Sequence, residues 1–154
     1  MKAHPFTLTL VYLFLTTYPL YAQVDASDCS DHPLLERIQG YYIERCSQSA
    51  RPLLVATAKK KQMEVQGNSI TIAYYGKADN LPNGYYLIKS YERAIKAHGG
   101  EKIFWDNGNS GNKPRATFHL TEEGKEYWIL LTNFRGVPTE GVASYDLTVV
   151  EKGG

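Results

Sequence analysis

The stretch YYLIKSYERAIKAHGG, from Tyr85 to Gly100, gives the clearest helix signal in the sequence. Its apolar positions recur at three- and four-residue spacing, and charged residues fill the other side. Asn83 is suited to cap the start of the helix, and Gly99 stands where a left-handed residue ends one. We therefore expect one long helix here, with a solvated basic face. Its apolar positions are Leu87, Ile88, Tyr91, Ala94, Ile95 and His98.

Runs rich in β-forming residues lie on both sides of this helix. Before it come GYYIERC and the two arms of KQMEVQGNSITIAYY, with a tight hairpin turn expected at Gly67 and Asn68. After it come EKIFWD, RATFHL, KEYWILLTNF and YDLTVVEK, with TEEG as a second hairpin turn. The pattern predicts an α+β fold in which the long helix packs on one face of a mainly antiparallel sheet, in the order β-β-β-α-β-β-β-β.

Length and composition indicate one globular domain behind an export signal. The chain has 154 residues, of which 43% are hydrophobic and 21% charged, enough for one core and too few for two ordinary domains. Residues 1–22 combine an early lysine, an apolar run and a small residue at Ala22, which is typical of a signal peptide. The alternative, a retained membrane anchor, would need about 20 apolar residues. We expect a single domain over residues 23–154, with no transmembrane segment in the mature chain.

The charge balance argues against nucleic acid as a partner. Without Lys2 the chain carries 16 basic and 16 acidic residues, whereas phosphate binding needs a basic excess on one face. The run Lys59, Lys60, Lys61 is the one local exception. We interpret it as an exposed turn or a lysine-blunted edge strand, and the alternative is contact with phosphate or an anionic surface.

The stretch DCSDHPLLERIQGYYIERC, from Asp28 to Cys46, contains the two cysteines of the chain. In an oxidising compartment a pair of cysteines is most simply a disulfide, so we predict a bond between Cys29 and Cys46. A reactive thiol beside His32 and a metal site remain alternatives, but no zinc-ligand spacing is present. We predict no bound metal and no cofactor.

Three blocks of the sequence resemble a known bacterial domain. They are DCSDHPLLERIQGYYI, SYERAIKAHGGEKIFWD and RATFHLTEEGKEYWILL, the last followed by YDLTVVEK. Together they resemble the N-terminal extracytoplasmic domain that precedes the peptidoglycan-binding domain in OmpA-family outer-membrane proteins. The resemblance implies export to the periplasm or outer membrane of a Gram-negative bacterium and a non-enzymatic role. Family members run on from this point into the second domain, whereas this chain ends at Gly154, so no peptidoglycan-binding residue can be carried over.

The leading functional hypothesis is a non-catalytic binding or scaffolding module of the cell envelope, with envelope proteins or a glycan as partner. Trp105 could stack on a sugar or peptide while Asp106, Asn107 and Asn109 hydrogen-bond its polar groups. The alternative is that Trp105 belongs to the core and DNGNSGN is a loop. A calcium site in this loop is less well supported than a ligand surface, because Asp106 is the only carboxylate of the loop.

The rival hypothesis is a small secreted hydrolase. It would use His32, His98 or His119 as the base, together with a carboxylate such as Glu122 or Glu123. None of the GxSxG, HExxH or Cys-His signatures is present, so we predict no enzyme and no catalytic residues.

Overall fold

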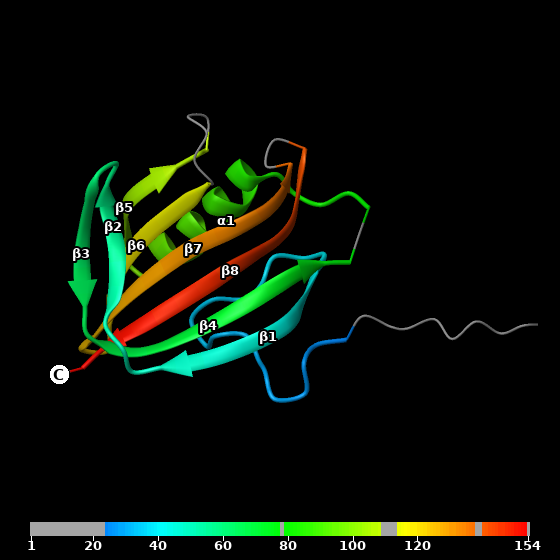
Figure 1. Cartoon of the computed structure of the whole chain (residues 1–154). Coiled ribbons are helices and arrows are strands. Elements are labelled where there is room, and N and C mark those ends of the chain that lie inside the picture. Colours follow the sequence, from blue (N-terminus) through cyan, green and yellow to red (C-terminus); the bar gives the residue numbers. More distant parts are fainter. Residues whose placement is uncertain (1–23, 78, 109–113, 138–139, 154) are drawn as a thin grey trace, which may run out of the picture.

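The computed structural model describes residues 24–77, 79–108, 114–137 and 140–153. Its main element is a six-stranded antiparallel sheet in the order β1-β4-β8-β7-β6-β5 (Figure 1). A separate hairpin of two strands and one helix, α1 (Gly84–Ala97), complete the fold of the described residues. The sheet strands are β1 (Tyr41–Ser49), β4 (Gly67–Gly76), β5 (Glu101–Asp106), β6 (Arg115–Glu122), β7 (Lys125–Val137) and β8 (Gly141–Lys152), and the hairpin strands are β2 (Leu53–Ala58) and β3 (Lys61–Val65). The predicted signal peptide lies outside the described residues.

The predicted antiparallel sheet with a single helix is confirmed, although α1 has only 14 residues and is not long. Its ends are the predicted ones: the Asn83 side chain accepts a hydrogen bond from the Tyr86 backbone N–H at 2.8 Å, and Gly99 has a φ of +81°. His98 is an exception to the apolar stripe, because it forms the C-cap and is exposed. Local capping chemistry therefore fixes where the helix begins and ends.

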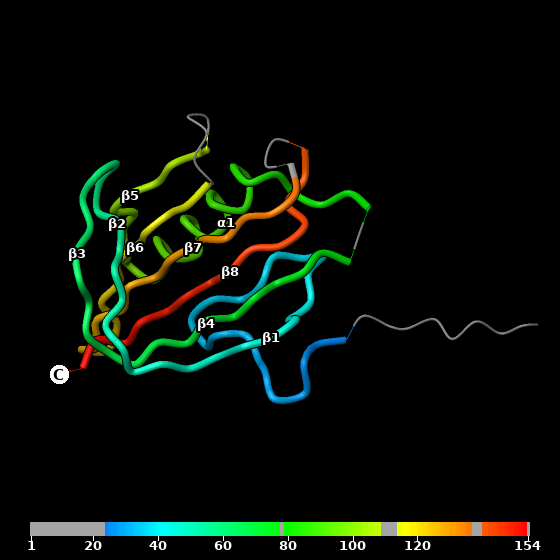
Figure 2. The backbone as a smooth tube through the Cα atoms, in the orientation of Figure 1, coloured from blue at the N-terminus to red at the C-terminus, as the bar shows by residue number. Residues whose placement is uncertain are grey.

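One face of the sheet carries the main core. Leu87, Ile88, Tyr91 and Ile95 of α1 pack on it and are buried. The N-terminal arm, residues 24–40, covers the rest of this face behind β1 and β4 (Figure 2) and adds the buried Leu35. Burying apolar faces of sheet and helix against each other is the main stabilising term in such a layered fold.

Hydrogen bonds and the disulfide fix the arm to the sheet. The Tyr74 hydroxyl donates to Asp31 at 2.7 Å, and Arg37 Nε donates to the second oxygen of Asp31 at 2.8 Å. Cys29 is joined to Cys46 of β1, as predicted. The arm therefore belongs to the folded domain.

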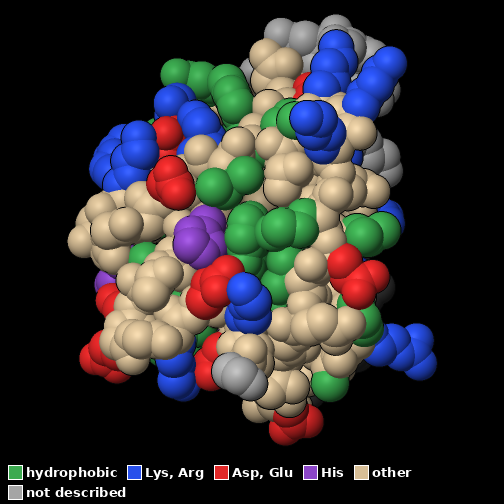
Figure 3. All heavy atoms as spheres, turned by 90° about the vertical axis from the view of Figure 1, so that its left-hand side faces the viewer, with side chains coloured by type: hydrophobic (Ala, Val, Ile, Leu, Met, Phe, Trp, Pro, Cys, Tyr) green, Lys and Arg blue, Asp and Glu red, His purple; other side chains and the backbone are tan. Residues whose placement is uncertain are grey.

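The β2–β3 hairpin covers part of the opposite sheet face. Val55 and Val65 from the hairpin form a second buried cluster with Trp128, Leu130 and Val150 of the sheet. The outer side of the hairpin leaves Leu54 and Met63 exposed. Figure 3, which views this side, shows hydrophobic side chains gathered at its centre with basic side chains above them.

The predicted hairpin turn at Gly67 and Asn68 is wrong, and so is the number of strands before the helix. Both residues lie inside β4, and β3 pairs with β2, a strand that is absent from the predicted order. Four strands, not three, precede α1. Gly67 serves a different purpose, because a Cβ there would lie 2.2 Å from the backbone oxygen of Glu151 in β8.

Candidate ligand-binding surfaces

Trp105 lies near the end of β5, an edge strand of the sheet, and packs against the main core on the helix side. It is neither fully buried nor freely exposed. The Tyr85 ring, from the first turn of α1, lies 5.8 Å from the Trp105 ring between centroids. Tyr85 is 57% exposed, so the two rings form an aromatic surface that solvent can reach.

Two lysines border these rings. The Lys102 Nζ lies 5.0 Å from the Trp105 ring centroid, and the Lys89 Nζ lies 6.0 Å from it. Lys89 is also 5.9 Å from the Tyr85 ring. These distances are in the range of cation–π contacts. We call Tyr85, Lys89, Lys102 and Trp105 the aromatic–lysine patch.

A bulge in β5 creates the patch. Lys102 pairs with Phe118 and Phe104 with Thr117, so Ile103 is an extra residue without a counterpart on β6. The bulge sends Ile103 and Phe104 toward the hairpin side, and Lys102 and Trp105 both face α1. In a regular strand, residues three apart would point to opposite faces.

Glu92 holds the lysines in place. Its carboxylate is nearly buried, with 8% of the side chain exposed, and lies 2.9 Å from Lys89, 3.0 Å from Lys96 and 3.1 Å from Lys102. Hydrogen bonds from these lysines, the Lys89 bond first, lower the pKa of Glu92 to about 2. Because one carboxylate faces three ammonium groups, the cluster retains an excess of two positive charges beside the aromatic rings.

A hollow of about 330 Å³ adjoins Trp105 at the end of β5. It is lined by Lys59 from the hairpin turn and by Phe104, Trp105, Asp106 and Asn107. The Asp106 carboxylate accepts a hydrogen bond from the Gly108 backbone N–H at 2.9 Å. Of the four ligand-surface residues predicted from the sequence, Trp105, Asp106 and Asn107 therefore line one hollow, and Asn109 lies outside the described residues.

The helical pattern alone assigns Lys89 to a solvated helix face and gives no connection between Lys89 and Trp105. A usable signal was present in the helix, because Tyr85 and Lys89 are four residues apart and so share a side of α1. No comparable signal places Lys102 beside Trp105, since that contact depends on the bulge at Ile103.

Two histidines proposed for a hydrolase do meet carboxylates. His98 Nδ1 lies 2.7 Å from Glu122 Oε1 on the helix side, with both side chains partly exposed. His119 Nε2 lies 3.4 Å from Glu126 Oε1, which also accepts from Trp128 Nε1 at 2.9 Å. Within the described residues, no hydroxyl or thiol is hydrogen-bonded to either ring.

The remaining residues of that hypothesis lie elsewhere. Glu123 occupies the predicted β6–β7 turn with a φ of +50°. His32 in the N-terminal arm lies edge-on to the Tyr127 ring, and burial lowers the pKa of His32. The thiol and metal alternatives for Cys29 and Cys46 are excluded by their disulfide. Across the described ranges, no group of three or more potential protein ligands is placed to hold a metal ion.

A further hollow, of about 1090 Å³, lies where the N-terminal arm, the β4–α1 loop and the start of β8 meet. Arg37 on its wall is held by Asp25 and Asp31. Tyr86 is 54% exposed at its rim. The hollow is open and mixed in polarity, so its shape alone does not indicate a class of ligand.

Comparison with models of known protein families and with curated proteins gives no match for this chain. In the described part of the chain, α1 is too short and too polar to cross a bilayer. The resemblance to the OmpA-family domain therefore stays a prediction.

Proposed function

We propose that this protein is a non-catalytic binding module of the bacterial cell envelope, exported to the periplasm or outer membrane, and that it binds acidic glycans at the aromatic–lysine patch. The observation that carries the proposal is the fixed pairing of two aromatic rings with an excess of ammonium charge. The Cys29–Cys46 disulfide supports an oxidising compartment. The resemblance to OmpA-family proteins supports the envelope.

The chemistry of the patch suits a sugar polymer that bears carboxylates or phosphates. Aromatic side chains offer flat apolar faces on which sugar rings can stack. The ammonium groups of Lys89 and Lys102 provide charge-assisted hydrogen bonds to an anionic substituent on such a ring. Because Glu92 already orients both lysines, little side-chain entropy is lost when the ligand binds.

The test compares a carboxylated with a neutral oligosaccharide. Oligogalacturonate and maltoheptaose would each be titrated into the protein by calorimetry at low and high salt. We expect only the uronate to bind, with an affinity that falls as salt screens the lysines. Tyr85→Ala and Lys89→Gln should each weaken binding about tenfold, equivalent to about 1.4 kcal/mol.

Matched controls lie outside the patch, with Tyr75 on the opposite sheet face and Lys125 at the β6–β7 turn. Tyr75→Ala removes another exposed tyrosine, and Lys125→Gln removes a lysine that pairs with Glu151. Both controls should bind the uronate like the unmodified protein. Equal binding of the neutral sugar, or an equal loss in the control variants, would refute the proposal.

The second candidate is the small secreted hydrolase, favoured by the 2.7 Å contact between His98 and Glu122. A positioned imidazole–carboxylate pair can act as a general base. Loss of a measured turnover on replacing His98 or His119 with alanine, with folding retained, would establish this candidate over the binding module.

A further inference from the structure

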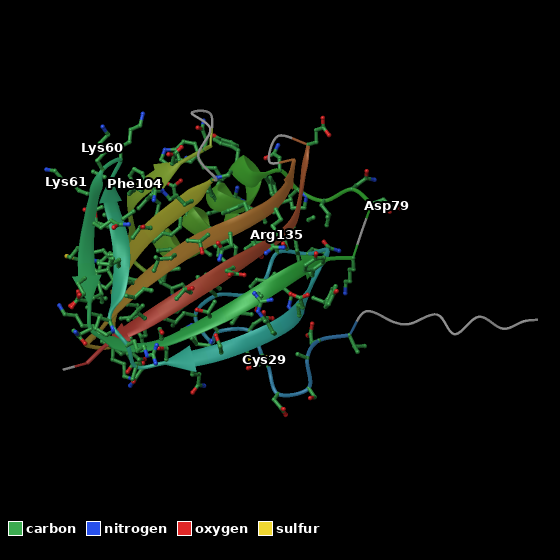
Figure 4. All side chains as sticks on the ribbon, in the orientation of Figure 1. Cys29, Lys60, Lys61, Asp79, Phe104 and Arg135 are labelled. Atoms are coloured by element: carbon green, nitrogen blue, oxygen red, sulfur yellow. A yellow bond between two sulfur atoms is a disulfide. The ribbon has the colours of Figure 1, made fainter. Side chains whose placement is uncertain are left out.

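The half of the sheet face that the hairpin leaves uncovered contains a hollow of about 220 Å³ with a floor of small residues. Ala73 of β4 and Ser144 of β8 form this floor and are buried, with 4% and 7% exposure. The register places Ala73 between Arg45 and Asp146, and Ser144 between Tyr75 and Arg135. The larger side chains at these neighbouring positions therefore form the walls of the hollow around the small floor residues. Arg135 is labelled in Figure 4.

Bulges on both sides of the hollow direct polar side chains over the floor. On β1, Glu44 is an extra residue between Ile43 and Arg45, so Glu44 and Arg45 both line the hollow. On β7, the register slips by one residue between Thr132 and Arg135, and Asn133 has a φ of +54°. Bulges and left-handed residues of this kind are enriched at functional sites.

The hollow carries charges of both signs from different strands. Arg45 comes from β1 and Arg135 from β7, on opposite sides of the floor. The only carboxylate paired with Arg45 among the described residues is its neighbour Glu44, at 3.1 Å, and both side chains are well exposed. No described carboxylate lies within ion-pair distance of Arg135. The guanidinium of Arg135 is thus available to an incoming anion.

Asp146 supplies the opposite charge. One of its oxygens accepts a hydrogen bond from the Asn133 amide at 2.7 Å, which fixes the carboxylate at the β7–β8 side of the floor. No lysine or arginine is ion-paired with Asp146 within the described ranges. A carboxylate held by a neutral amide keeps its negative charge available to a cationic group of a ligand.

We propose that this hollow binds a free α-amino acid as a zwitterion. The ligand carboxylate lies between Arg45 and Arg135, and the ligand ammonium group faces Asp146. Two guanidinium groups and two carboxylates balance in the lining, so a simple anion or cation would meet repulsion as well as attraction. The volume is below the 300–1,000 Å³ typical of sites for drug-sized ligands, which suits a molecule of amino-acid size.

The test uses ligands that differ by one charge. Glycine, L-alanine, L-serine and L-glutamate would be titrated into the full protein and followed by backbone amide chemical shifts. We expect saturable shifts at Ala73, Ser144 and Asp146 for at least one amino acid with a dissociation constant below about 10 mM. The analogue of that amino acid with an acetylated amine, and the analogue with an amidated carboxyl, should each bind at least about tenfold more weakly.

Variants separate the two ends of the ligand. Arg135→Gln should abolish the shifts, whereas Arg93→Gln, a control arginine exposed on α1, should not change them. Asp146→Asn should weaken binding of the amino acid without weakening that of its acetylated analogue. Absence of saturable shifts for all four amino acids, undiminished binding to Arg135→Gln, or equal binding of the acetylated analogue to the unmodified protein would overturn the proposal. The site lies on the sheet face opposite the aromatic–lysine patch, so either proposal can fail alone.

Discussion

Replacing Glu92 with glutamine removes the carboxylate that Lys89, Lys96 and Lys102 share at distances of 2.9 to 3.1 Å. Glutamine keeps the size of the side chain and one acceptor oxygen, but it leaves three ammonium groups close together without a counter-charge. We expect this single change to destabilise the contact between α1 and β5, because losing one partner of a buried ion pair leaves uncompensated charge.

The magnitude follows from the pKa of Glu92. Its fall from 4.5 to about 2 on folding corresponds to an upper limit of about 3 kcal/mol. Lys89 and Lys96 are 39% and 60% exposed, so solvent screens much of this interaction. We therefore expect Glu92→Gln to lower the free energy of unfolding at pH 7 by about 1 to 2 kcal/mol.

The pH dependence of the free energy of unfolding provides a second test of this prediction. Since the folded state lowers the pKa of Glu92, the stabilisation is fully present above pH 4.5 and is lost as the pH falls toward 2. Urea unfolding of both proteins at several pH values would measure it. Their difference should be largest at neutral pH and should shrink between pH 4.5 and 2.

The control is Glu101→Gln, which removes a neighbouring but exposed carboxylate. It should change stability by less than about 0.5 kcal/mol. A loss for Glu92→Gln no larger than that of the control, or a loss that is the same at pH 2 and pH 7, would show that the lysine cluster is not organised by Glu92.

Three further predictions concern the framework. Reducing the disulfide should lower stability by about 3 kcal/mol in urea unfolding, because it spans 17 residues of sequence; an unchanged midpoint would contradict a stabilising role. Gly67→Ala should cost about 2 kcal/mol or more in thermal unfolding, because the added Cβ would lie 2.2 Å from the Glu151 oxygen, and Gly153→Ala, which meets nothing within 4 Å, should be neutral. Tyr145→Phe breaks the 2.9 Å hydroxyl contact with Tyr91 and should cost about 1 to 3 kcal/mol by calorimetry; a neutral result would mean that water replaces the lost partner.

Local signals made the helix and the later strands predictable. The capping of α1 depends on Asn83 and Gly99, which act on atoms a few residues away. Ile70, Ile72 and Tyr74 alternate along β4, and all three pack in the main core. The β6–β7 turn at TEEG also formed where two alternating runs meet. In each case the contacts that determine the local structure join residues that are close together in the sequence.

Strand pairing could not be predicted in the same way. Gly67 and Asn68 are good turn residues, but β4 pairs with β1 and β8, and β3 pairs with β2. The reason for glycine at position 67 is its close approach to β8, more than 80 residues later. Local turn chemistry cannot show such a contact, because it depends on the register of distant strands.

Both proposed sites depend on departures from regular strand geometry, and this explains why the sequence alone did not reveal them. Strict alternation would separate Lys102 from Trp105, and it would send Glu44 and Arg45 to opposite faces. The bulges at Ile103 and Glu44 bring each pair to one side of the sheet. Because a bulge adds one residue to a strand, deleting Ile103 should restore alternation in β5 and leave Lys102 and Trp105 two residues apart, with both still facing α1. The aromatic–lysine patch should then survive while the hairpin loses its contact with Ile103, so the bulge adds an apolar residue toward the hairpin and keeps Trp105 on the side of α1.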